Sequence, residues 1–186
     1  MRDRSAIRAA SSHAPYDARA VANMLLDIAD ARGVPLTQIS LLKLLYFGHG
    51  WYLSETGTSL IAQEFEAWER GPVLKVVRDE FKSFGKKAIT TRALKLDIYS
   101  GRRSKVPPDL TPDDAAFVKS IFEAYHVYDA LQLSDMTHEA DSPWDRLWNS
   151  SEPVGRLALR LRNEDIKAHF DSLAKRFRLS EGRSAT

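Results

Sequence analysis

The sequence predicts a mainly α-helical protein of the α+β class, with a single compact helical domain and a small β-hairpin or short sheet. Apolar residues recur at helical spacing along most of the chain, and polar caps, prolines or glycines bound these stretches. Only short segments show an extended pattern. The length of 186 residues, with 44% hydrophobic and 28% charged residues, is typical of one globular domain.

A flexible leader is expected over residues 1–15, which mix three arginines with many small residues and end at Pro15. The first helix is predicted from Asp17, a favourable N-cap, to about Arg32. Gly33 follows in the position where a glycine commonly ends a helix. The predicted domain therefore occupies residues 16–178, and residues 179–186 are expected to be a disordered tail.

Thr37 caps a second predicted helix over residues 38–56. This segment is apolar nearly all round, which is typical of a buried helix, so we expect it to be the central helix of the fold. Gly48 and Gly50 lie within it, on either side of His49. Glycines at such positions indicate the close approach of another helix.

The periodicity changes after this helix. Residues 59–61 and 64–68 have the pattern of two short strands, which predicts a hairpin. Pro72, after Gly71, is predicted to occupy the first position of a third helix, which ends at Gly85. The buried face of this helix is expected to hold Val73, Val77, Phe81 and Phe84.

Residues 86–110 are the least regular part of the chain and are predicted to form an exposed loop, although residues 89–99 also fit an edge strand. This segment carries the one clear charge asymmetry in a chain of net charge +2. Against a single acid, Asp97, it has the basic residues Lys86, Lys87, Arg92, Lys95, Arg102, Arg103 and Lys105.

Cap signals predict the remaining helices. Thr111 and Pro112 start a helix that ends near Val127, with Asp114 in the third position of a capping box. Asp129 caps a further helix that ends near Glu139.

A short helix is predicted from Ser142 and Pro143 to about Trp148. Asn163 is predicted to cap the last helix, which has acidic residues in its first turn and basic residues near its end.

No catalytic or cofactor motif stands out. The chain has no cysteine, which excludes disulfides, thiolate zinc sites, iron–sulfur clusters and a cysteine nucleophile. Phosphate-binding glycine motifs are also missing. His138, Glu139 and Asp141 could form a polar site, but Ser142 stands where a zincin needs its second histidine. We therefore expect no metal, no cofactor and no enzymatic activity.

Neither an export signal nor a membrane-spanning stretch is evident, so a cytoplasmic protein is expected. The most informative side chains are Trp68 and Trp144, which lie beside turn or cap signals, and the basic segment. Tryptophan and arginine are enriched at the energetic centres of interfaces. For both tryptophans, core packing is the interpretation that residue type alone favours, and exposure at an interface is the alternative. For the basic segment, a solvated loop comes first, contact with an acidic protein second and contact with nucleic acid third.

Three separated motifs carry a resemblance to a known family. They are Leu41-Leu42-Lys43-Leu44-Leu45-Tyr46-Phe47 with Gly50-Trp51-Tyr52-Leu53, then Phe65-Glu66-Ala67-Trp68 with Gly71-Pro72-Val73, and finally Leu133-Ser134-Asp135 with Thr137-His138-Glu139 and Ser142-Pro143-Trp144. In this order and spacing, over about residues 17–150, the chain resembles the Panacea-domain antitoxins, the family that includes SocA-like and GepA-like proteins.

The resemblance implies a non-enzymatic antitoxin that neutralises a cognate protein toxin encoded beside it. Direct binding is one implied mechanism, and delivery of the toxin to an ATP-dependent (Clp-type) protease is the other. The resemblance identifies neither the toxin nor the oligomeric state. The expected partner-binding residues are Trp68, Arg70, Gly71, Pro72, Trp144, Lys86, Lys87, Arg102 and Arg103.

Two other function classes stay open. A DNA-binding regulator of its own operon would bind DNA with an affinity that falls steeply as salt rises. The near-neutral charge and the short segment before the first helix argue against it, so nucleic acid is not an expected partner. A hydrolase would need His138 with Glu139 or Asp141 in a water-lined cleft.

Overall fold

The computed structural model describes residues 14–152, 156 and 159–183, with side chains described up to residue 176. Within them, seven α-helices and a 3-10 helix surround a small amount of sheet, so the fold is mainly α, as predicted. The elements are α2 (Ala18–Arg32), α3 (Gln38–Thr56), β1 (Phe65–Trp68), β2 (Gly71–Val73), α4 (Lys75–Phe81), η1 (Lys82–Phe84), β3 (Leu94–Leu96), β4 (Arg103–Lys105), α5 (Pro112–Tyr125), α6 (Ala130–Thr137), α7 (Pro143–Ser150), β5 (Arg160–Leu161) and α8 (Asn163–Arg183).

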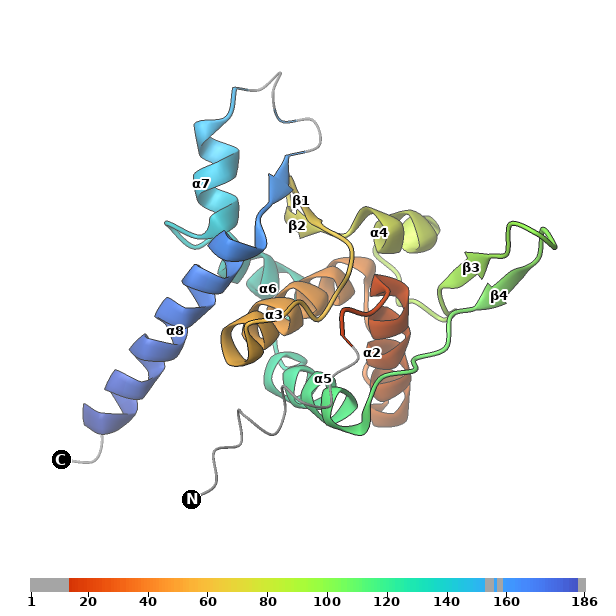
Figure 1. Ribbon diagram of the computed structural model, residues 1–186, viewed down its shortest axis with the longest axis horizontal. Coiled ribbons are helices and arrows are strands. Elements are labelled where there is room, and N and C mark those ends of the chain that lie inside the picture. The colour runs from red at the N-terminus through yellow and green to blue at the C-terminus, as the bar shows by residue number, and fades with distance from the viewer. Residues whose placement is uncertain (1–13, 153–155, 157–158, 184–186) are drawn as a thin grey trace.

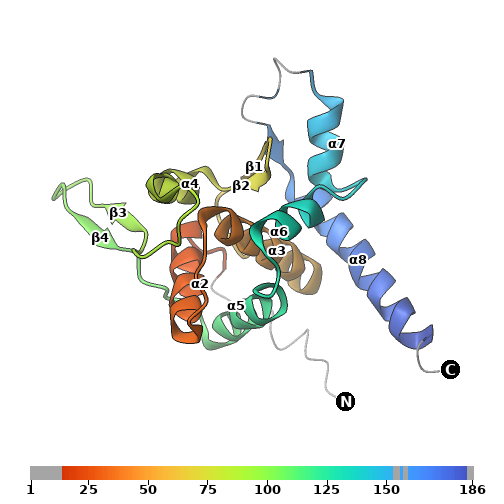
Figure 2. The same ribbon diagram turned by 180° about the vertical axis from the view of Figure 1, so that it is seen from behind.

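Helix α3 is the centre of the molecule. Thirteen of its nineteen residues are buried, and it contacts helices α2, α4, α5, α6 and α8 and strand β2 (Figures 1 and 2). The prediction of a central helix is therefore confirmed. Its bounds also follow the predicted signals, because the Thr37 side chain accepts a hydrogen bond from the Ser40 N–H and Gly57 ends the helix in the left-handed region.

The two glycines of α3 differ in their surroundings. A Cβ at Gly50 would overlap the ring of Phe170 on α8, so glycine is required for this helix contact. A Cβ at Gly48 would lie 3.8 Å from its nearest neighbours, which is an ordinary contact. The predicted close approach is confirmed at Gly50 and is wrong at Gly48.

The main sheet has three antiparallel strands in the order β2-β1-β5. The predicted hairpin exists, but β1 pairs with residues 71–73 rather than with residues 59–61. Pro72 therefore lies in an edge strand, where its missing N–H is tolerated, and not at the start of a helix. Helix α4 begins at Lys75, with Leu74 in the N-cap position.

Residues 86–110 contain a second hairpin where a loop was expected. Strands β3 and β4 pair with each other to form a projecting arm, on the side away from α7 and α8 (Figure 1). The buried amide of Asn23 on α2 fixes the base of this arm. It accepts from the Ala93 N–H at 2.7 Å and donates to the carbonyls of Ala93 and Val106 at 3.1 and 2.8 Å.

Asp114 has a different role from the predicted one. Thr111 caps α5 as expected, but the Asp114 carboxylate is fully buried and does not complete a capping box. It accepts hydrogen bonds from the hydroxyls of Tyr16 at 2.6 Å, Tyr52 at 2.9 Å and Thr111 at 2.9 Å. This carboxylate connects three segments that are far apart in the sequence.

We expect Asp114→Asn to lower the free energy of unfolding by about 2 kcal/mol. The side-chain amide of the variant keeps one acceptor oxygen, but its NH2 group faces hydroxyls that donate to the carboxylate in the wild type. Asp113→Asn, at the exposed neighbouring position, is the control, and we expect it to cost less than about 1 kcal/mol. Urea denaturation followed by circular dichroism measures both, and equal losses would contradict the role assigned to Asp114.

The last helix begins at Asn163, so this residue is not its N-cap. The Asn163 amide instead donates to Ser59 Oγ at 2.8 Å, and its carbonyl oxygen accepts from His49 Nε2 at 3.0 Å. His49 Nδ1 accepts from the Ile61 N–H, which places the ring proton on Nε2. Burial lowers the pKa of His49 to about 4, so the ring is neutral at pH 7.

Both ends of the chain carry predictions that the structure covers only partly. The predicted leader lies outside the described residues up to residue 13, and Tyr16 already pairs with Ile61 in an isolated bridge. Helix α8 continues to Arg183, beyond the predicted end at residue 178. The last three residues of the predicted tail are outside the described residues.

Candidate functional site

The three motifs that carried the family resemblance converge at the turn between β1 and β2. Lys43 of the central helix is buried, and its Nζ donates a hydrogen bond to the Arg70 carbonyl. Gly71 has a φ of +96°, a conformation that favours glycine. A Cβ at Gly71 would overlap Lys43 Nζ and lie 2.7 Å from Thr137 Oγ1 and 3.1 Å from His138 Nε2.

Burial controls the charge of this cluster. It lowers the pKa of Lys43 to about 7, since an ammonium loses its hydration there. Burial also lowers the pKa of His138, and the neighbouring Lys43 lowers it further. His138 Nε2 has no hydrogen-bond partner among the described residues.

Three of the expected partner-binding residues are buried. Trp144 is 7% exposed, and its indole N–H donates to the Trp68 carbonyl at 2.7 Å while its ring stacks on His138. Gly71 and Pro72 are buried within β2. These residues shape the turn and present little surface in the free chain. Their contact with a partner stays a prediction.

Two of the expected residues, Trp68 and Arg70, present at least part of their surface at the turn itself. Trp68 is half-buried beneath the guanidinium of Arg78, 4.9 Å from the ring centroid. Arg70 is exposed, and it lines a hollow of about 560 Å³ with Lys86. We call this the turn hollow. Its other lining residues are Thr37, Ile39, Glu69, Gly85, Ala130, Leu131, Ser134, Asp135 and His138.

The basic segment is partly neutralised within the protein. Arg92 pairs with Asp27 and Asp30, and Arg103 pairs with Glu80 at 2.6 Å. The remaining expected residues are exposed but separated, since Lys86 and Lys87 follow η1 and Arg102 lies at the tip of the arm. The segment therefore does not form one continuous patch of free positive charge.

An exposed apolar cluster at the α5–α6 junction was missed by the sequence analysis. Val127 is 68% exposed, Tyr128 38% and Leu131 71%. We call these three residues the junction cluster. The available signal was the pair Leu131 and Leu133 on one short predicted helix. Two residues that are two positions apart do not share a helix face, so one of the two leucines must lie away from the core. Large exposed apolar side chains that lie together mark interaction sites more often than scattered ones do.

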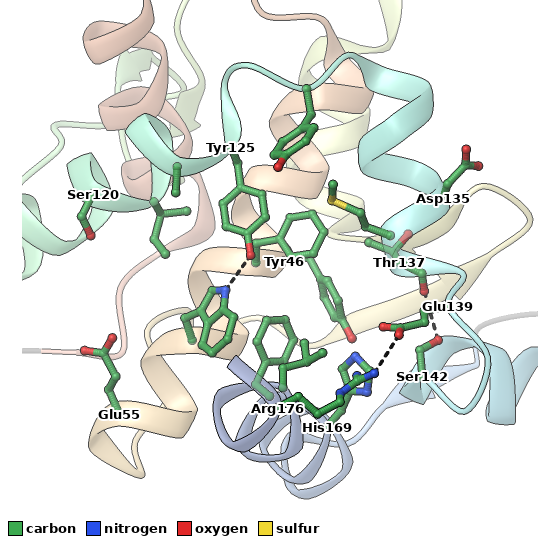
Figure 3. Close-up of a pocket in the computed structure, with 18 of the residues that line it drawn as sticks. Tyr46, Glu55, Ser120, Tyr125, Asp135, Thr137, Glu139, Ser142, His169 and Arg176 are labelled. Carbon is green, nitrogen blue, oxygen red and sulfur yellow. Dashed lines mark hydrogen bonds and ion pairs between the residues drawn. The ribbon is translucent and has the colours of Figure 1, made fainter. Parts of the chain in front are cut away.

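A groove of about 930 Å³ lies between α3, α5, α6 and α8. We call it the aromatic groove. Figure 3 shows Tyr46 and Tyr125 in its middle, with Ser120 and Glu55 on one side and Asp135 and Glu139 on the other. Its aromatic lining residues are Tyr46, Phe47, Trp51, Phe117, Tyr125, Tyr128, His169 and Phe170.

Tyr46 is the unusual member of this lining. Its side chain is 2% exposed, and its hydroxyl has no hydrogen-bond partner among the described residues. The neighbouring hydroxyl of Tyr125, in contrast, accepts from the Trp51 indole N–H at 2.7 Å. Because an unpaired buried hydroxyl costs free energy, Tyr46 marks a place where a bound group can supply an acceptor.

Charged side chains lie on both sides of the groove, with Glu55 on one side and Asp135 and Glu139 on the other (Figure 3). Glu139 on the α6–α7 connection pairs with Arg176 of α8 at 3.1 Å (Figure 3). Asp135 is exposed and has no ion-pair partner among the described residues. Burial lowers the pKa of His169, which favours its neutral form at pH 7. Among the described residues, Asp135 is therefore a rim carboxylate whose charge no ion pair compensates.

The polar residues near the end of α6 are not brought together as a hydrolytic site. His138 stacks on Trp144, Glu139 pairs with Arg176, and Asp141 is exposed. The described residues contain no group of three or more histidines and carboxylates that could hold a metal ion. Among the described helices, none combines the length and the apolar composition needed to cross a bilayer.

Comparison with known proteins gives a consistent result. The family model "Antitoxin SocA-like, Panacea domain" matches residues 41–145. A curated protein named "Antitoxin SocA", from Caulobacter vibrioides (strain NA1000 / CB15N), is 40% identical over 154 residues, which cover 83% of this chain and 82% of that protein. No solved structure matches the chain. The matched region includes Lys43, Gly71, Tyr46 and the junction cluster.

Proposed function

Since the chain belongs to the SocA-like antitoxins with a Panacea domain, we propose that it neutralises a cognate protein toxin by binding it directly. Antitoxin function follows from the family, and direct binding is the mechanism that the surface supports best. The described residues display an exposed apolar cluster beside two hollows, an arrangement suited to holding another protein.

The junction cluster is the observation that carries this proposal. Leu131 lies on the wall of the turn hollow, and Tyr128 lies on the wall of the aromatic groove. Asp135 lines both hollows, so α6 forms a ridge between them. We propose that the toxin covers this ridge, with Trp68, Arg70 and Lys86 at the edge of the contact. A stable complex of this kind commonly buries about 1,200–2,000 Å² in total.

We expect Leu131→Glu to weaken toxin binding at least about tenfold, because it places a charge in the apolar centre of the contact. The chain should keep its stability, since the Leu131 side chain is already 71% exposed. Ile98→Glu, at an 80% exposed position on the β3–β4 arm, is the matched control. Calorimetric titration with the product of the adjacent reading frame measures both, and equal affinities would contradict the proposed surface.

Delivery to a protease is the second mechanism that the resemblance implies. Occlusion and delivery differ in one measurable quantity, the half-life of the toxin in cells. An unchanged toxin level with blocked toxin activity indicates occlusion. A shortened half-life that is restored by deleting residues 179–186 or the first 13 residues indicates an adaptor that uses that segment.

A further inference from the structure

We propose that the aromatic groove receives an amphipathic helix of the toxin, whose apolar face covers the aromatic floor and whose edge carries a basic residue opposite Asp135. This inference rests on the proposed function, since it names the part of the partner that the antitoxin holds. It goes further by assigning a second contact region, which adjoins the junction cluster at Tyr128.

The groove has the composition of a binding site rather than of an incompletely packed core. Its volume of about 930 Å³ is at the upper end of the range for ligand sites. Phe47 and Tyr125 stack with their ring centroids 4.4 Å apart, and Trp51 meets Phe170 edge to face. These contacts hold the floor rigid, so an entering apolar side chain would find a preformed surface.

The walls of the groove decide between a helix and an extended peptide as the occupant. Helices α3, α5, α6 and α8 form these walls, and their backbone groups already pair within each helix. An extended peptide would find no strand edge to pair with and would leave its own backbone polar groups unsatisfied on aromatic rings. A helix satisfies its backbone internally and presents only side chains.

The polar groups of the groove indicate which polar and charged side chains the entering helix should carry. The Tyr46 hydroxyl needs an acceptor, which a serine, threonine, glutamine or carboxylate side chain on the entering helix can supply. Asp135 has no ion-pair partner among the described residues, and Arg176 is already paired with Glu139. A basic residue on the edge of the entering helix therefore complements this rim.

The groove is continuous with the surface proposed above. Tyr128 belongs to the junction cluster and also lines the groove. A toxin that covers the ridge of α6 therefore has a direct path for one of its helices into the groove. Two contact regions that share a boundary are therefore assigned to one interface.

Filling the groove tests the proposal. Ala124 is exposed on α5 and lines the groove, so Ala124→Trp places an indole in the space that the helix would occupy. Ala116→Trp, also exposed on α5 but outside the groove lining, is the matched control. With the full chain and the product of the adjacent reading frame, we expect Ala124→Trp to raise Kd on the order of 100-fold. The control should leave Kd unchanged, and both variants should unfold at the wild-type temperature.

Tyr46→Phe provides a second and more conservative test. The Tyr46 hydroxyl has no partner within the described residues, so its removal should leave the stability of the free chain unchanged or slightly higher. We expect the affinity for the toxin to fall by up to about tenfold, the contribution of one hydrogen bond. An unchanged affinity would show that no toxin group reaches Tyr46 and would overturn this part of the proposal.

The outcomes separate the groove from the antitoxin function. If the wild-type chain does not bind the toxin, the proposed direct binding fails. If the wild-type chain binds and Ala124→Trp binds equally well, only the groove assignment fails. Sedimentation of the free proteins gives a further outcome. If the wild-type chain self-associates and the Ala124→Trp variant is monomeric, the groove binds a second copy of this chain, and the proposal is overturned.

Discussion

Replacing Gly50 with alanine is expected to lower the free energy of unfolding by roughly 3–5 kcal/mol, beyond the usual cost of overpacking. The new methyl group would overlap the ring of Phe170. That ring cannot move aside easily, because it is 1% exposed and packs edge to face against Tyr46 and Trp51. Helix α8 must therefore shift away from α3, and the contact between these two helices is the most extensive in the fold.

Gly48→Ala is the control for this prediction, two residues away on the same helix. The nearest atoms to a Cβ at Gly48 are 3.8 Å away, so the methyl group fits without displacement. Alanine also forms helix more favourably than glycine by about 1 kcal/mol, and we expect this variant to be as stable as the wild type or slightly more stable. Urea denaturation followed by circular dichroism compares the two. If both variants lost a comparable amount of unfolding free energy, the overlap with Phe170 could not be the cause of the loss at Gly50.

The helices of the core were predictable because their signals are local. Asp17, Thr37 and Thr111 each cap the helix that follows, and Gly33 ends α2 in the left-handed region, as the sequence indicated. A cap and an apolar period act within a few residues, so one sequence suffices to recognise them.

The sheet was predicted less well, because one of its strands fits two local patterns and another lies far away in the sequence. Pro72 fits the first turn of a helix and an edge strand equally well by local rules. The decisive partner of β1 on its other side is β5, at Arg160–Leu161, more than ninety residues away. Local pattern cannot reveal such a pairing, and the helix start was assigned three residues too early.

The site was only partly predictable for a related reason. The sequence pointed to the turn at Arg70 and Gly71, and it left Trp144 open between core packing and a place in the contact with a partner. Trp144 is buried because its indole N–H finds an acceptor in the Trp68 carbonyl, on a strand far away in the sequence. The aromatic groove combines side chains from four helices, so no single segment shows its pattern.

Replacing Lys43 with methionine is expected to stabilise the protein most at pH 6 and progressively less toward pH 10. Burial lowers the pKa of Lys43 from 10.5 to about 7 in the folded chain. Between these values the unfolded chain binds a proton that the folded chain does not, so wild-type stability rises with pH over that interval. Below about pH 7 both states are protonated, and the folded wild type bears the full cost of a buried ammonium.

The size of this effect follows from the shift. Lowering the pKa of Lys43 from 10.5 to about 7 changes the free energy of unfolding of the wild type by up to about 5 kcal/mol between pH 7 and pH 10.5. The hydrogen bond from Lys43 to the Arg70 carbonyl offsets part of it, because it favours the charged form. Denaturation at pH 6 and at pH 9.5, with the exposed Lys119→Met as control, measures the difference. An advantage of Lys43→Met that does not change with pH would show that the lysine is not desolvated.

Lys43→Met also separates stability from function. The variant removes the donor that holds the Arg70 carbonyl beneath the Gly71 turn, although methionine fills much of the same space. The exposed side chain of Arg70 then loses its fixed position at the edge of the turn hollow. If the toxin uses this edge, a variant that is more stable at pH 6 should bind the toxin more weakly. A gain in stability together with a loss of toxin affinity is expected if the buried Lys43 serves to position a binding surface and not to stabilise the fold.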